Sequence, residues 1–125
     1  MSRMFIVLGA LLGMTGVALG AFGAHGLEAT LAATGRAATF DTASQYHQIH
    51  ALALLAVGLL GLRLSSGLIR AAGWLLLAGG LVFSGSLYVL AVFDLGIMGA
   101  VAPVGGALLI AGWGALALGA WRGLA

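Results

Sequence analysis

The chain has 125 residues, of which 62% are hydrophobic and only 6% are charged. A soluble domain carries about 25% charged residues, so this composition excludes a water-facing shell and makes lipid the main solvent. The absence of cysteine excludes disulfides, thiolate metal sites and cysteine nucleophiles. The five basic residues are all arginines and are scattered along the chain, which excludes a nucleic-acid-binding patch and hence nucleic acid as a partner.

Four apolar segments run through the chain, and each is long enough to cross a bilayer at about 20 residues per span. They predict helices over about 4–24, 42–62, 71–93 and 102–121, with an outer polar loop over 27–41. The fold class expected is therefore all-α: a single transmembrane domain over residues 1–125, built as an integral membrane four-helix antiparallel bundle. A cleavable signal peptide is the competing interpretation of the first segment, but a discarded segment has no reason to carry the packing face described next.

Glycines form a stripe along one face of the first segment and recur in the last one. In a soluble helix each glycine costs up to about 1 kcal/mol relative to alanine. In a bilayer, small residues instead allow two helices to approach closely. The residues expected to serve helix packing are Gly9, Gly13, Gly16, Gly20, Gly105 and Gly112.

The arginines indicate the orientation of such a bundle. In a four-span arrangement Arg3, Arg63, Arg70 and Arg122 lie on one side of the membrane and Arg36 lies on the other. Because cytoplasmic loops carry the excess of basic residues, we expect both termini to be cytoplasmic.

Polar side chains gather in one layer of the expected spans. At 1.5 Å per residue, His47 and His50 lie roughly 24 and 20 Å along the helix from Arg63, and Ser84 lies roughly 21 Å from Arg70. With hydrocarbon about 30 Å thick, this layer falls in the outer half of the membrane. Such residues either hold helices together by hydrogen bonds or form a small binding site, because ionisable groups within a span are candidates for function.

Several kinds of site remain open at this stage. A metal or haem site would use His25, His47 and His50 as ligands, and a quinone or lipid pocket would use His50 and Tyr88. A hydrolase would need an acid to orient a histidine beside Ser84 or Ser86, and a proton path would need polar residues through the full depth. Trp113 falls near mid-membrane, where its indole N–H needs a partner.

Five motifs occur in order along the chain and carry a family resemblance. They are Gly20-Ala-Phe-Gly-Ala-His25-Gly26, Tyr46-x-x-x-His50-Ala-Leu-Ala, Phe83-Ser-Gly-Ser-Leu-Tyr88, Pro103-Val-Gly-Gly106 and Ala111-Gly-Trp113. Together they resemble the domain-of-unknown-function family 423, the YgdD-like small bacterial inner-membrane proteins, to which the eukaryotic transmembrane protein 256 is related. The resemblance implies four transmembrane helices and a multi-pass inner-membrane location, and it implies no activity.

Two residues depart from the family pattern: His47 stands where the family has glutamine, and Ala102 where it usually has threonine. A metal site common to the family is therefore not expected to use His47. The residues that match the pattern, and that we expect to bind a ligand, are His25, Tyr46, His50, Ser84, Ser86 and Tyr88.

The function expected from these observations is non-enzymatic and needs no cofactor. The chain is either an accessory subunit or a binder of a small ligand or lipid. The alternative is a metal- or quinone-linked redox protein that uses His25 and His50. The expected partners are the lipid bilayer and either another membrane protein or further copies of this chain.

Overall fold

The helices of this protein are longer than the apolar segments that predict them. The computed structural model describes residues 1–124. It contains five helices and no strand in that range: α1 (Ser2–His25), α2 (Glu28–Thr34), α3 (Ala37–Gly61), α4 (Gly67–Phe93) and α5 (Met98–Gly123). The expectation of an all-helical chain is confirmed.

The outer segment differs from the expected polar loop over 27–41. Most of it is helical, because α2 occupies its centre and α3 begins at Ala37, five residues before the expected start at 42. Phe40 and Ala43 are buried in this early part of α3 and make helix the favoured conformation there. Similarly, α5 begins at Met98 and not at 102, which places Pro103 inside the helix.

Three helices have the length and apolar composition of a membrane span: α1, α4 and α5. Four spans are expected from the sequence, and α3 is the one that the structure leaves without this composition. α3 has 25 residues, but the polar stretch over 44–50 dilutes the apolar content of its first half.

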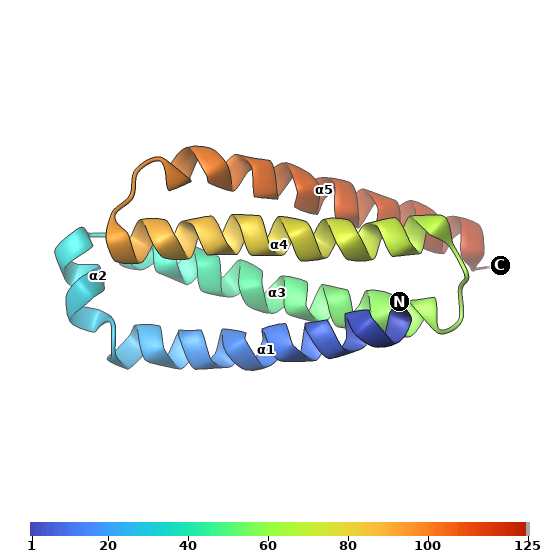
Figure 1. Cartoon of the computed structure of the whole chain (residues 1–125), viewed down its shortest axis with the longest axis horizontal. Coiled ribbons are helices and arrows are strands. Elements are labelled where there is room, and N and C mark those ends of the chain that lie inside the picture. Colours follow the sequence, from blue (N-terminus) through green and yellow to red (C-terminus); the bar gives the residue numbers. More distant parts are fainter. Residues whose placement is uncertain (125) are drawn as a thin grey trace.

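The four long helices lie side by side and alternate in direction (Figure 1). Extensive contacts join α1 to α3, α3 to α4, and α4 to α5. Both termini lie at one end of the molecule, and α2 covers the ends of α1 and α3 at the other (Figure 1). No comparable contact joins α1 to α5 among the described residues, so the helices form a folded row whose edges are α1 and α5.

The apolar core is concentrated toward the end of the molecule that holds the termini. Its most completely buried large side chains are Phe5, Leu54, Val57, Ile69 and Leu76. Phe5 reaches from α1 across to α4, where its ring meets the edge of Trp74 with centroids 5.5 Å apart. A smaller cluster of Leu31, Phe40 and Ala91 lies at the α2 end, so each end of the row has its own apolar packing.

Two glycines set the closest approaches between helices. A Cβ atom placed on Gly9 would lie 2.8 Å from the backbone nitrogen of Leu55, and one on Gly105 would collide with the backbone of Phe83. Gly112 is similarly close to Leu76, whereas Gly13 has open space around it. The glycine stripe of α1 therefore packs along part of its length only.

Polar contacts attach the α2 end to the end of α4. Arg36 donates from Nε to Asp94 Oδ1 at 2.6 Å, and Thr34 donates to the carbonyl oxygen of Ala91 at 2.8 Å. Gly35 ends α2 with a left-handed φ of 68°, a conformation that glycine adopts without steric cost. These contacts bring together Arg36 and Asp94, which are 58 residues apart in sequence.

Candidate functional site

A cavity of about 230 Å³ lies between α1, α3 and α4, in the outer part of the row. It exists because α1 and α4 both pack extensively on α3 and not on each other. Its apolar walls come from Leu12, Leu19, Leu76, Gly80, Leu81 and Gly85, and its polar walls from Thr15, His47, His50, Ser84 and Tyr88.

His47 is the centre of a chain of hydrogen bonds that crosses all three helices. Its Nδ1 lies 2.8 Å from the Tyr88 hydroxyl on α4, and its Nε2 lies 3.2 Å from Thr15 Oγ1 on α1. Thr15 gives its one hydroxyl proton to the carbonyl oxygen of Leu12 at 3.1 Å, so it accepts from His47 Nε2–H. Tyr88 then donates to the unprotonated Nδ1.

His50 is buried, with 5% of its surface exposed, and its tautomer is set by Trp113. The indole N–H of Trp113 lies 3.0 Å from His50 Nε2. An indole can only donate, so Nε2 is unprotonated and His50 is neutral. Its Nδ1–H donates to the carbonyl oxygen of Tyr46 at 2.7 Å. This bond supplies the partner that Trp113 needs at mid-membrane.

Ser84 completes the polar wall by joining α4 to α3. It is buried and donates to the carbonyl oxygen of Ala43 at 2.9 Å. Within residues 1–124, every buried polar side-chain atom has a hydrogen-bond partner. The polar layer is therefore a connected network and not a set of isolated costly groups.

The histidines do not fit a metal site. Both ring nitrogens of His47 and of His50 are engaged in hydrogen bonds, and a metal ligand needs a free lone pair. His25 ends α1 and is exposed. In the part of the chain that the structure describes, no group of three histidine, cysteine, aspartate or glutamate side chains is close enough to hold a metal ion.

The residues expected to bind a ligand separate into two groups. His50, Ser84 and Tyr88 line the cavity. Tyr46 does not line it: its ring is 40% exposed and stacks on His50 with centroids 5.8 Å apart. Ser86 is buried and donates to the carbonyl oxygen of Phe83 in its own helix; neither it nor His25 lines the cavity.

Sequence reasoning misses two residues of this site. Thr15 is the one hydroxyl residue in the apolar run over 4–24, and that isolation is the signal that could have identified it. His47, treated above as a departure from the family pattern, bonds to both flanking helices.

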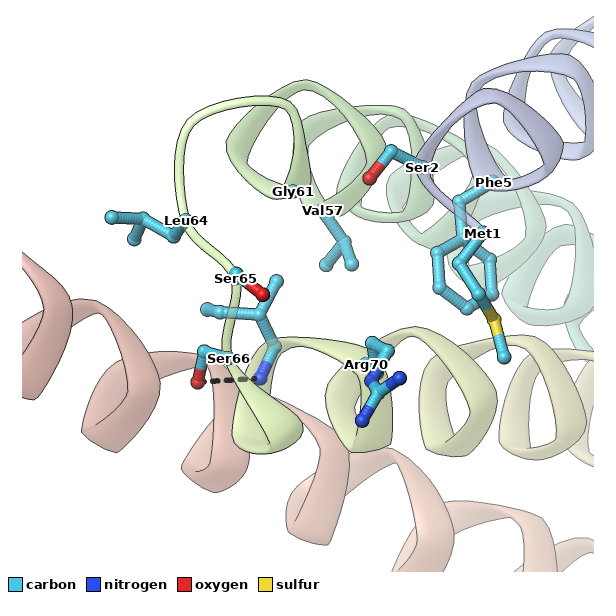
Figure 2. A pocket seen from close by; sticks show the side chains of 10 residues that line it. Met1, Ser2, Phe5, Val57, Gly61, Leu64, Ser65, Ser66 and Arg70 are labelled. Carbon is cyan, nitrogen blue, oxygen red and sulfur yellow. Dashed lines mark hydrogen bonds between the residues drawn. The ribbon is translucent and has the colours of Figure 1, made fainter.

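A second cavity, of about 200 Å³, lies at the opposite end of the row, where the first turn of α1 meets the link between α3 and α4. Figure 2 shows Met1, Phe5 and Arg70 beside it, with the Ser66 hydroxyl accepting from the backbone of Ile69. Its polar residues sit at the mouth of the terminal end, and Arg70 is exposed.

A family whose description reads "Protein of unknown function (DUF423)" matches residues 19–106 by its sequence model. The chain belongs to this family. A UPF0382 membrane protein of Staphylococcus saprophyticus is 44% identical over 120 residues, which are 96% of this chain and 98% of that protein. The UPF0382 membrane protein YwdK of Bacillus subtilis is 46% identical over 112 residues, with 89% and 90% covered. No solved structure matches the chain significantly.

The family assignment confirms the resemblance drawn from the five motifs. The matched range includes four of the five polar cavity residues: His47, His50, Ser84 and Tyr88. The relatives of this DUF423 member are named as membrane proteins, in agreement with its apolar helices.

Proposed function

We propose that this DUF423 member is a multi-pass protein of the bacterial inner (plasma) membrane, in which α1, α3, α4 and α5 all span as one four-helix transmembrane domain. The two chain ends and the link between α3 and α4 lie at the same end of the molecule (Figure 1). That end carries Arg3, Arg63, Arg70 and Arg122, and the opposite end carries Arg36 paired with Asp94. The positive-inside rule then makes both termini cytoplasmic.

Its proposed activity is the non-enzymatic binding of a small apolar ligand or lipid in the cavity between α1, α3 and α4. The observation that carries this proposal is a 230 Å³ space in the membrane layer whose polar wall residues already have partners within the protein. Ser84 donates to a backbone carbonyl and not to a histidine, so no nucleophile is activated there.

Filling the cavity tests this function. Gly85 lines the cavity, and a Cβ added to it would meet nothing within 4 Å. Gly85→Leu should therefore fold and place its side chain in the cavity. Gly114→Leu is the matched control, because Gly114 on α5 is equally unobstructed and does not line the cavity.

The readout is mass spectrometry of molecules that co-purify with each variant in mild detergent. We expect the wild type and Gly114→Leu to retain a lipid or other apolar molecule in a fixed ratio to protein, and Gly85→Leu to lose it. Equal retention by all three proteins would place the bound molecule elsewhere and contradict the proposal.

A role as an accessory subunit is the second candidate. α1 and α5 form the edges of the row, and each packs extensively on one long helix only. Their remaining faces are available to another membrane protein or a second copy of the chain. Cross-linking in native membranes from positions on the outer face of α5, such as Ile110, should then capture one discrete partner; a ladder of unrelated products would contradict this role.

A further inference from the structure

The cavity has an unequal supply of hydrogen-bond donors and acceptors. Each side-chain proton of its polar residues is given to a partner inside the protein: Thr15 to Leu12, His47 to Thr15, His50 to Tyr46, Ser84 to Ala43 and Tyr88 to His47. The side-chain lone pair of His50 is also engaged, by Trp113. No N–H or O–H donor of these side chains is left for a ligand.

What the cavity retains is acceptor capacity. A hydroxyl oxygen has one proton and two lone pairs, so the hydroxyl oxygens of Thr15, Ser84 and Tyr88 can each accept a further hydrogen bond. Ser84 and Tyr88 are four residues apart on α4 and therefore lie one above the other on the same face. Two acceptors thus lie on the same wall of the cavity.

We propose, building on the function proposed above, that the cavity selects a hydrophobic molecule that donates one hydroxyl group, such as a phenol, a quinol or a long-chain alcohol. A ligand that only accepts, such as a quinone carbonyl or an ether, finds no donor there. Its polar atom would be buried without a partner, which is costly in an apolar site.

The size of the cavity agrees with this class of ligand. An apolar cavity of about 150 Å³ holds a benzene molecule, and this one has about 230 Å³. The space accommodates a substituted ring or the first carbons of an aliphatic chain, while the rest of the molecule extends along the groove between α1 and α4. Leu81 at this groove is exposed, so the cavity opens toward the lipid.

Two matched ligand pairs test the inference: para-hexylphenol with its methyl ether, and nonanol with its methyl ether. Each pair differs only in the donated proton. Binding is measured by equilibrium dialysis of the wild-type protein in detergent against the same detergent, so that partition into micelles cancels. Gly85→Leu and Gly114→Leu serve as the blocked and control proteins.

We expect the hydroxyl compound of at least one pair to bind about fivefold more tightly than its ether, the effect of one net hydrogen bond. The pair that shows it identifies a ring or a chain alcohol as the ligand type. Equal binding of both members of each pair, lost in Gly85→Leu, would overturn the hydroxyl preference and leave the ligand site intact. Binding unchanged in Gly85→Leu would overturn both the preference and the proposed site.

Discussion

At the scale of single residues, His50 shows how neighbours set the state of a buried imidazole. Trp113 can only donate, so it requires the unprotonated Nε2 of His50. The carbonyl oxygen of Tyr46 can only accept, so it requires Nδ1–H. A proton added at Nε2 would break the bond to Trp113 and leave a charge in a site that is 5% exposed. The residue is therefore held neutral by geometry.

This arrangement predicts the tautomers of both cavity histidines. NMR of the ring nitrogens should show His50 protonated at Nδ1 and His47 protonated at Nε2, because Thr15 accepts from His47. Tyr88→Phe should leave the state of His50 unchanged and alter the signal of His47 Nδ1 only. A spectrum with His50 protonated at Nε2 would be incompatible with the bond from Trp113.

Removing the indole donor should destabilise the protein. Trp113→Phe keeps an aromatic ring against His50, where the centroids are 5.9 Å apart, but leaves a buried acceptor without its partner. The expected cost is about 1 to 3 kcal/mol in the free energy of unfolding, measured by thermal unfolding in detergent. Trp121→Phe is the control, because Trp121 is 84% exposed; equal effects in both variants would refute the role of the bond.

At the scale of the helices, glycine matters where two backbones meet and not wherever it recurs. Gly9 and Gly13 belong to one stripe of α1, yet only Gly9 lies against the backbone of α3. Gly16 faces the side chain of Gln48, with a Cβ distance of 3.3 Å, and a side chain can move aside more readily than a backbone. The periodic stripe therefore contains positions of very different sensitivity.

Alanine substitutions should separate these positions. Gly9→Ala brings a methyl group to 2.8 Å from Leu55 N, and the overpacking should cost about 1 to 3 kcal/mol of stability. Gly13→Ala meets nothing within 4 Å and gains helix propensity, so its unfolding temperature should be unchanged or higher. If both variants melted together, the close contact between α1 and α3 would not stabilise the protein.

At the scale of the whole molecule, the number of spans decides where the termini lie. If only the three candidate spans α1, α4 and α5 crossed the membrane, the two termini would face opposite sides. The helices instead alternate in direction with both termini at one end (Figure 1). The polar residues that lower the hydropathy of α3 are in part satisfied internally, through His47 and His50, which offsets the cost of placing them in lipid.

Reporter fusions distinguish the two topologies. A reporter that is active only in the cytoplasm should be active at Ala125 and at the link near Ser65, and inactive at the turn near Gly96. This pattern requires α3 to cross the membrane. A cytoplasmic reporter active at both Ala125 and Gly96, or inactive at Ser65, would show that α3 does not span and would contradict the proposed orientation.

The all-helical class and the family follow from the sequence alone, because both depend on local patterns. Apolar runs of about 20 residues require helices in lipid whatever surrounds them, and the five motifs that carry the family resemblance are short contiguous segments. Helix ends were less accessible: α3 begins at Ala37 because Phe40 and Ala43 pack against other helices, which composition does not reveal.

The cavity and its network were decided by the tertiary structure. His50 and Trp113 are 63 residues apart, His47 and Tyr88 are 41 apart, and Thr15 and His47 are 32 apart. Depth along each helix placed several of these residues in one layer, but depth carries no information on rotation about the helix axis. Only the packed helices determine that Tyr88 faces the cavity while Tyr46 faces away from it, and which proton each side chain has already given away.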